Sequence, residues 1–319
     1  MLIARANMSK TALLFAGQGA QVVGMGKDLA NKFPTARHWF DRANSALGYD
    51  LAAVCFSGPD SELTKTEHAQ PAIYLVSWIA FELLKEHIPG LLFEAAAGLS
   101  LGEFTALAAA GSMSFEDGLR VVRQRGEFMQ QACDATHGTM AAVIGLDEAP
   151  TREVCAEAGV VLANLNCPGQ LVISGETEQI SRACELAKAK GARRALPLSV
   201  AGAYHSPLMS SAQPKLEATL QSIQLTAPLV QVISNVTAQP HGAPTTIRAL
   251  LVDQVTSSVR WEQSMRCLLA QGYTRFIELG PGTALSGFMK RIDKTAVMHN
   301  VGDVPSLEAT IASLIPIPA

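Results

Sequence analysis

Paired cysteines and metal-binding spacings are missing from this sequence of 319 residues. Its six cysteines are scattered without a CxxC pair, and its seven histidines form no HxxxH pair. A disulfide framework or a zinc site would need such spacings, so we expect neither, and no metal of any kind. Unpaired thiols fit a reducing compartment, and the expected location is the cytoplasm.

An excess of positive charge and long apolar runs are also absent. The chain has 25 Lys and Arg residues against 28 Asp and Glu residues, and its formal net charge is -3. Nucleic-acid-binding domains usually carry a basic footprint, so we expect no nucleic-acid partner. The longest strongly apolar run, 71–81, is too short to span a membrane. The first ten residues are too short and too polar for a signal peptide, which makes Met8 a candidate natural start.

Short apolar runs alternate with helical patterns along the chain. The runs 11–17 and 93–98 are strand-like, and each ends at a glycine. A helix is expected over 35–47, ended by Gly48, and a second, apolar nearly all round, is expected to begin at Pro71. This alternation predicts an α/β fold with a parallel sheet.

The segment 138–204 has a different order of predicted strands and helices. Its order is strand, helix, two strands joined by a Cys-Pro-Gly turn, helix and strand. The order βαββαβ is the ferredoxin-like pattern. Because the segment lies inside the chain, we expect a small domain, 135–205, inserted into a large α/β domain made of 1–134 and 206–319.

A GxSxG motif, 98–102, stands between a strand-like run and a helical stretch. This is the context of a nucleophile elbow, in which a serine sits at the N-terminus of a helix. The alternative is a glycine-rich turn whose serine only caps the helix. The context favours Ser100 as a nucleophile.

A serine hydroxyl needs a base, and His205 is the best placed of the histidines. It is expected to end a strand and to precede an N-cap and first-turn pair, Ser206-Pro207. The alternative is a partly buried histidine held by the backbone, which would be favoured if Ser100 were absent.

Arg125 lies on one face of a helical pattern that begins at Ser114, among Phe115, Val122 and Met129. A buried arginine is costly unless it is paired. It could pair with a buried acid or reach the rim of the protein. It could equally clamp a substrate carboxylate through two charge-assisted hydrogen bonds. The pattern alone leaves these interpretations equal.

The Gly-Gln-Gly turn at 17–19 closes the first strand-like run. It lacks the third glycine of GxGxxG and does not match a P-loop. A loop that supplies a backbone N–H to an oxyanion is the more plausible interpretation.

Together these segments resemble the malonyl-CoA:acyl carrier protein transacylases and the related acyltransferase domains of polyketide synthases. The resemblance runs from about Thr11 to Ile292. It rests on nine motifs in order: FAGQGAQ (15–21), QPA (70–72), GLSLGEFTAL (98–107), RQRGEFMQ (123–130), NLNCPGQLVISG (164–175), GAYHSPLM (202–209), ISNVTA (233–238), LVDQVTSSVRW (251–261) and ELGPGTALSG (278–287). It implies an α/β-hydrolase-like large domain with an inserted ferredoxin-like domain.

The resemblance implies a ping-pong transfer for fatty-acid or polyketide synthesis. Ser100 corresponds to the serine that becomes acylated, His205 to its base, and Arg125 to the residue that holds the malonyl carboxylate. The implied partners are malonyl-CoA and acyl carrier protein. The coenzyme A thioester is a substrate, and no cofactor is implied.

The resemblance implies roles for four further residues. Gln18 and Leu101 correspond to the backbone donors of the oxyanion hole. Gln254 corresponds to a residue whose main-chain carbonyl orients the histidine, and Asn166 to a position near the bound thioester. Many relatives have histidine where this chain has Leu99, so a less polar surrounding of Ser100 is expected.

Specificity and docking can also be predicted. The motif GAYHSPLM resembles the malonyl-selective form, in which an aromatic residue, here Tyr204, excludes a branched acyl group. Two basic groups are candidates for guiding an acidic carrier protein or are ordinary solvated surface: Lys188, Lys190, Arg193 and Arg194, and Lys290, Arg291 and Lys294.

Two other functions stay open at this point. A serine hydrolase of the α/β type would need a triad acid, and acids such as Asp147 between Ser100 and His205 fall in the inserted segment, where none is expected. A carrier-protein-binding module with an inactive site is the second alternative. The presence of Ser100, His205 and Arg125 favours the transferase over both.

Overall fold

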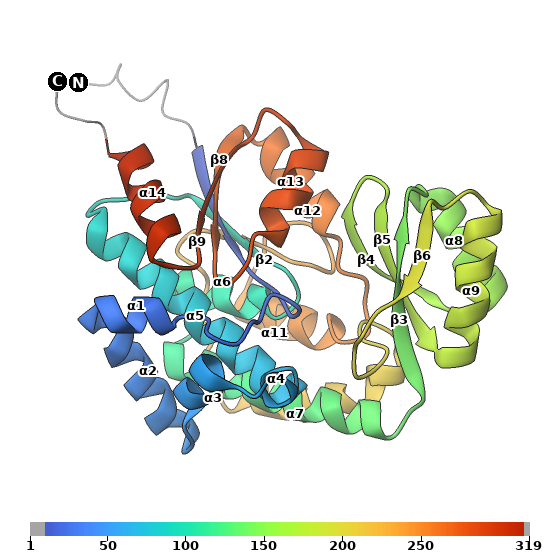
Figure 1. The fold of residues 1–319 in the computed structure, drawn as a ribbon, viewed down its shortest axis with the longest axis horizontal. Coiled ribbons are helices and arrows are strands. Elements are labelled where there is room, and N and C mark those ends of the chain that lie inside the picture. Colours follow the sequence, from blue (N-terminus) through green and yellow to red (C-terminus); the bar gives the residue numbers. More distant parts are fainter. Residues whose placement is uncertain (1–9, 316–319) are drawn as a thin grey trace.

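The computed structural model describes residues 10–315, which form two β-sheets (Figure 1). Within that range the large sheet has five parallel strands in the order β7-β2-β1-β8-β9. They are β1 (Lys10–Phe15), β2 (Ala95–Gly98), β7 (Gln231–Ile233), β8 (Tyr273–Leu279) and β9 (Val297–Val301). The predicted α/β class with a parallel sheet is therefore confirmed.

Helices cover both faces of this sheet (Figure 1). They are α1 (Lys27–Lys32), α2 (Pro34–Leu47), α3 (Leu51–Ser57), α4 (Asp60–Leu63), α5 (Thr66–His87), α6 (Gly102–Ala109), α7 (Phe115–Asp134), α10 (Gln213–Gln221), α11 (Pro244–Asp253), α12 (Trp261–Ala270), α13 (Ala284–Ile292), α14 (Val304–Leu314) and the 3-10 helix η1 (Pro207–Ala212). Side chains of β1 alternate between the faces. Leu13 and Phe15 join the core that contains α5 and α7, whereas Ala12 and Leu14 join the core of α12 and α13.

The start of α5 differs from its prediction. The helix begins at Thr66, so Pro71 lies inside it and does not open it. Proline cannot donate to the carbonyl four residues earlier, that of Glu67, but only this one bond is lost, close to a helix end where N–H groups lack partners anyway. Gly126 of α7 packs against this first turn, because a Cβ there would lie 2.5 Å from the Thr66 carbonyl oxygen.

The small sheet is antiparallel and has its own core. Its strands are β3 (Gly138–Ile144), β4 (Val161–Cys167), β5 (Gln170–Glu176) and β6 (Arg194–Pro197), in the order β4-β5-β3-β6. The helices α8 (Glu148–Ala158) and α9 (Thr177–Ala189) complete the predicted βαββαβ order. Buried residues such as Val143, Ile173 and Ile180 fill the space between this sheet and its helices.

Within residues 10–315, no helix combines the length and the apolar character that crossing a bilayer requires. Over the same range, no group of three or more His, Cys, Asp or Glu side chains is arranged to hold a metal ion. The candidate start at Met8 lies outside the described residues.

The GxSxG turn connects β2 to α6 as the motif predicts. Ser100 has a φ of 52°, in the left-handed region that side chains other than glycine rarely adopt. The glycines allow this turn to be tight: a Cβ on Gly98 would lie 1.9 Å from the Gly102 carbonyl group, and one on Gly102 would lie 2.3 Å from the Phe15 carbonyl oxygen. Ser100 is thereby fixed at the carboxyl end of β2.

We expect the Gly98→Ala variant to lose about 3 kcal/mol or more of unfolding free energy, because the added methyl group meets backbone atoms that cannot move aside. Gly287→Ala is the matched control, since a Cβ at Gly287 in α13 meets nothing within 4 Å. This control should keep its stability or gain up to about 1 kcal/mol. Urea unfolding measures both variants, and equal stability would refute the steric account of the elbow.

Candidate active site

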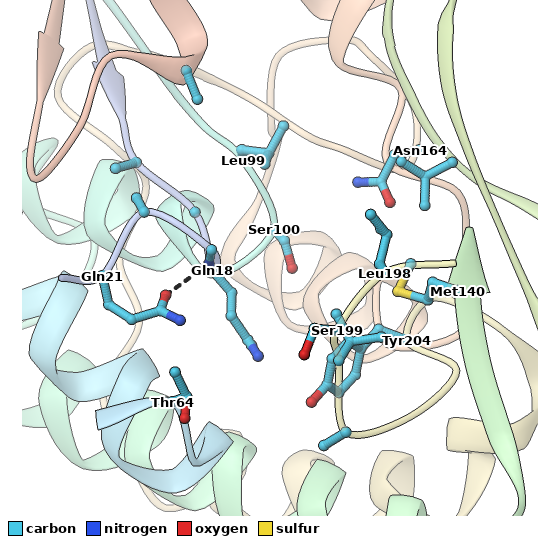
Figure 2. A pocket seen from close by; sticks show the side chains of 18 of the residues that line it. Gln18, Gln21, Thr64, Leu99, Ser100, Met140, Asn164, Leu198, Ser199 and Tyr204 are labelled. Atoms are coloured by element: carbon cyan, nitrogen blue, oxygen red, sulfur yellow. Dashed lines mark hydrogen bonds between the residues drawn. The ribbon is translucent and has the colours of Figure 1, made fainter. Parts of the chain in front are cut away.

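A cavity of about 900 Å³ lies between the two sheets. Figure 2 shows Ser100 facing it, with Gln18 and Thr64 on one side and Met140 and Asn164 on the other. Gln18 follows β1 and Thr64 follows α4, so the first side belongs to the part of the fold that contains the large sheet. Met140 and Asn164 lie on β3 and β4 of the small sheet. A ligand in this cavity would therefore contact both halves of the fold.

Ser100 and His205 form a hydrogen-bonded pair in this cavity. Ser100 Oγ lies 2.9 Å from His205 Nε2, and His205 Nδ1 lies 2.9 Å from the carbonyl oxygen of Gln254. A carbonyl oxygen only accepts hydrogen bonds, so Nδ1 carries the imidazole hydrogen and Nε2 presents a lone pair to the serine. The base is thus oriented by a backbone carbonyl, in the position that an acid occupies in a Ser-His-Asp triad.

The prediction that His205 ends a strand is wrong. The strand β6 ends at Pro197. After one more hydrogen bond to β3, from the Leu198 N–H to the Met140 carbonyl oxygen, the chain turns, as the Val200 N–H donates to the Leu198 carbonyl oxygen, and His205 lies in the loop that leads to η1. Its φ of 57° is left-handed. Ser206 does cap η1, because its hydroxyl accepts from the N–H of Leu208. The loop and the cap together fix the imidazole.

His205 is buried, and this determines its protonation. Burial, and after it the nearby positive charge of Arg125, lower the pKa of His205 to about 4. Hydrogen bonds with the backbone at Gln254 and Ser257 oppose the shift. The imidazole is therefore neutral and able to accept a proton throughout the neutral pH range.

Arg125 projects from the buried face of α7 and is only 1% exposed. Its Nη1 donates to Gln70 Oε1 at 2.7 Å, and its Nη2 donates to Gln254 Oε1 at 2.9 Å and to Ser100 Oγ at 3.1 Å. Among the described residues it forms no ion pair with a carboxylate, and its Nε has no partner. Burial lowers the pKa of Arg125 to about 10. The interpretation as a contact ion pair with a buried acid is therefore wrong.

Two backbone N–H groups are free next to Ser100. Within residues 10–315, the N–H groups of Gln18 and Leu101 donate no hydrogen bond inside the protein. Leu101 is the N-cap of α6, so its N–H belongs to the positive end of the helix dipole. The loop of Gln18 lies close to the elbow, because a Cβ on Gly17 would lie 2.5 Å from the Leu99 carbonyl oxygen. The arrangement suits two donors to an oxyanion.

Of the predicted site residues, Gln18, Ser100, Asn166 and His205 line the cavity, whereas Leu101, Arg125 and Gln254 do not. Asn166 on β4 is buried, and its Oδ1 has no partner among the described residues. Leu99 lines the cavity beside Ser100. The side chain of Gln254 has a second function that was not predicted, since its Nε2 donates to the Ser100 carbonyl oxygen at 3.0 Å.

Sequence reasoning missed the polar residues behind the elbow. Asn235 accepts from the Ser100 N–H at 2.6 Å and donates to the Gly98 carbonyl oxygen at 2.7 Å. Glu103 contacts Asn235, Gln254 and His241. The motifs GLSLGEFTAL and ISNVTA contain Glu103 and Asn235, but nothing in the sequence indicates that they meet.

The pKa of His205 predicts how the reactivity of Ser100 depends on pH. The rate at which a sulfonyl fluoride modifies Ser100 should stay level down to about pH 5 and fall only as His205 becomes protonated. A rate that halves near pH 6.5, the usual pKa of histidine, would contradict this. Removing the Arg125 charge in Arg125→Ala should move the fall to higher pH, because that charge lowers the pKa of His205.

The same shift has a consequence for stability. His205 has a lower pKa in the folded state than in the unfolded chain, so the unfolded chain binds the proton first as the pH falls. The contribution of the neutral buried imidazole is complete above about pH 6.5 and is lost between there and about pH 4.

Known proteins are similar to this chain both in sequence and in fold. The family model described as acyl transferase domain matches residues 12–308. The malonyl CoA-acyl carrier protein transacylase of Bacillus subtilis (strain 168) is 44% identical over 312 residues, which cover 96% of this chain and 98% of that protein.

Solved structures agree closely with the present one. The malonyl CoA-acyl carrier protein transacylase of Coxiella burnetii matches with a TM-score of 0.92 and 36% identity, covering 96% of this chain and 98% of that one. A malonyl-transacylase in complex with a type II polyketide synthase acyl-carrier protein matches with a TM-score of 0.93 and 38% identity, covering 96% of this chain and 100% of that one. The chain belongs to the acyl transferase domain family, with the malonyl-CoA:acyl carrier protein transacylases among its relatives.

Proposed function

We propose that this chain transfers a malonyl group from malonyl-CoA to the phosphopantetheine thiol of acyl carrier protein, through a malonyl ester on Ser100. The observation that carries the residue roles is the position of Ser100 Oγ, 2.9 Å from His205 Nε2 and 3.1 Å from Arg125 Nη2. A base and a carboxylate-binding cation thus meet at one hydroxyl. The family membership and the names of the full-length relatives support the same reaction.

The first half-reaction acylates the serine. His205 Nε2 takes the Ser100 proton while Oγ attacks the thioester carbonyl carbon. The N–H groups of Gln18 and Leu101 bind the oxyanion, each contributing about 2.7–4 kcal/mol if they act as other oxyanion-hole donors do. The tetrahedral intermediate then collapses with cleavage of the C–S bond. The imidazolium returns its proton to the coenzyme A sulfur, and the malonyl ester remains.

The second half-reaction repeats these steps in reverse order. The carrier protein's phosphopantetheine thiol enters the cavity from which coenzyme A has left, and His205 accepts its proton as the sulfur attacks the ester. Collapse of the second intermediate returns the proton to Ser100 Oγ and leaves the malonyl thioester on the carrier. No cofactor takes part in either step.

Arg125 gives the site its preference for an acyl group with its own carboxylate. The guanidinium is buried, and its hydrogen bonds within the described residues go only to neutral oxygen atoms, so a malonyl carboxylate is the partner that best offsets its desolvation. The tethered acyl group then fills space beside Ser100 that water would otherwise occupy, which favours transfer over hydrolysis.

Three further assignments belong to the same proposal. We assign residues 135–205 to an inserted small domain and 1–134 with 206–319 to the catalytic domain, because each sheet has its own buried core. The six unpaired cysteines support a cytoplasmic location.

The two predicted basic groups lie within the described residues, and none of their members lines the cavity. Docking of the carrier protein on these groups therefore stays a prediction. Arg291 in particular donates to the Pro168 carbonyl oxygen at 2.7 Å and links α13 to the turn between β4 and β5.

Arg125→Ala tests the proposed function. It removes a charge-assisted contact worth about 1.5–3 kcal/mol, so the rate of malonyl transfer should fall about tenfold to a hundredfold or more. Acetyl transfer should hold or rise, because a neutral acyl group no longer faces a buried cation. The measurement is kcat/KM for malonyl-CoA and acetyl-CoA with one carrier protein. Equal losses with both acyl groups would make Arg125 a structural residue.

Tyr204 is expected to exclude a branched acyl group. It is buried beside His205 and lines the cavity, and its hydroxyl lies 2.6 Å from Thr66 Oγ1, which fixes the ring. An extra methyl group that does not fit costs about 1–3 kcal/mol, so malonyl-CoA should be preferred over methylmalonyl-CoA by roughly tenfold to a hundredfold.

The Tyr204→Ser variant should lose most of this preference. Thr66→Val, which removes only the hydroxyl partner and keeps the ring, should lose less of it. Comparable kcat/KM values for the two substrates with the unchanged protein would refute the role of Tyr204.

A further inference from the structure

A buried carboxylate lies behind the nucleophile elbow. Glu103 is on the first turn of α6, is completely buried and does not line the cavity. Its Oε2 accepts from the N–H of Asn235 at 3.0 Å and from Gln254 Nε2 at 2.7 Å, and its Oε1 lies 2.6 Å from His241 Nε2. A buried carboxylate is costly unless hydrogen-bond donors and a positive charge compensate it.

His241 can bind Glu103 without a positive charge of its own. Its Nδ1 is buried and has no hydrogen-bond partner among the described residues. In a doubly protonated ring this atom would be an unsatisfied N–H donor, which costs about 1–3 kcal/mol. The neutral ring with its hydrogen on Nε2 donates to Glu103 and leaves only a lone pair unpaired at Nδ1.

Arg125 is the cation that faces Glu103, and Gln254 stands between them. The Gln254 amide donates through Nε2 to Glu103 and accepts through Oε1 from Arg125 Nη2 at 2.9 Å. The attraction of Glu103 opposes the lowering of the Arg125 pKa by burial, and Glu103 is the carboxylate that acts on Arg125 in this way. The amide dipole is aligned with both charges.

We propose that Glu103 is a positioning residue for malonyl transfer, which supplies the counter-charge of Arg125 from one amide away and so leaves the guanidinium free to bind the substrate carboxylate. The Coulomb attraction between two charges falls only with the inverse of their distance, whereas a hydrogen bond needs contact. An acid in contact with Arg125 would compete with the malonyl group for the same N–H donors. An acid behind Gln254 balances the charge of Arg125 without competing for the N–H donors that bind the malonyl group.

The Glu103→Gln variant isolates this charge. Its amide oxygen can still accept from Asn235 and Gln254, and its NH2 group can donate to His241 Nε2 once the imidazole hydrogen moves to Nδ1. The hydrogen bonds on Gln254 are thereby kept while the negative charge is lost. The experiment combines this variant with Arg125→Met, which removes the cation at similar volume, in a double-mutant cycle.

Activity gives the first readout. Without its counter-charge, Arg125 attracts an anionic acyl group more strongly and disfavours a neutral one. The ratio of kcat/KM for malonyl-CoA to that for acetyl-CoA should therefore rise about fivefold or more in Glu103→Gln. In the Arg125→Met background the same substitution should leave the ratio within about twofold. A residue that only supports the elbow would lower both activities equally and leave the ratio unchanged in both backgrounds.

Stability gives the second readout. With Arg125 present, Glu103→Gln should lower the equilibrium constant for folding by about tenfold or more, because the cation loses its partner. With Arg125→Met present, it should lower that constant much less, because an unpaired anion is removed and only the unpaired N–H at His241 Nδ1 remains as a cost. If Glu103→Gln alone fails to fold, the double variant must fold, and a double variant that also fails overturns the proposal.

Glu278→Gln is the matched control. Glu278 is another buried carboxylate, whose oxygens accept from the N–H groups of Leu285 and Ser286 at 2.9 and 2.7 Å, and it forms no hydrogen bond with Gln254 or Arg125. Because Glu278 lines the cavity, this control is read in stability alone. Its substitution should show no coupling to Arg125→Met.

The inference about Glu103 rests on the proposed role of Arg125, and the experiment distinguishes the failure of one from the failure of the other. If Arg125→Met leaves the malonyl preference intact, the proposed function fails. If that preference is lost but the cycle shows no coupling, only the role of Glu103 fails.

Discussion

Arg125 carries a positive charge into the interior of the protein, where it contacts Gln70, Gln254 and Ser100 but no carboxylate within the described residues. Burying a cation in this way is costly unless another charge compensates it. An acyl group with its own carboxylate is therefore a better occupant of the cavity than a neutral one. Burial, and after it the same charge, lower the pKa of His205, which keeps the base neutral. Arg125 thus contributes both to substrate preference and to the protonation of the base.

The two sheets allow this charge to meet the nucleophile. The strand β2 of the large sheet ends at the elbow of Ser100, and Arg125 reaches the same hydroxyl from α7, which packs against α5. The loop before η1 supplies His205, and a carbonyl of Gln254 rather than an acid orients it. The small sheet closes the other side of the cavity with residues such as Asn166. The chemistry therefore depends on segments that meet only when the whole chain has folded.

Features that depend on neighbouring residues could be predicted from the sequence. The glycines around Ser100 signal a tight turn between a strand and a helix, and the helical spacing around Arg125 places it on a buried face. The strand predicted to end at His205 ends at Pro197 instead, because the chain turns between Leu198 and Val200, and the mostly apolar residues there do not reveal this turn. Glu103 and Asn235 could not be predicted as partners, because they are far apart along the chain and each is a common polar residue when considered alone. Their roles appear only in the hydrogen bonds behind the elbow.

The central claim is that a malonyl group becomes covalently attached to Ser100 before it reaches the carrier. Mass spectrometry of the protein mixed with malonyl-CoA, in the absence of carrier protein, tests this most directly. The account predicts a mass increase of one malonyl group, located by peptide mapping to Ser100, retained over time and released when acyl carrier protein is added. Turnover of malonyl-CoA without an adduct, or an adduct on another residue, would contradict it.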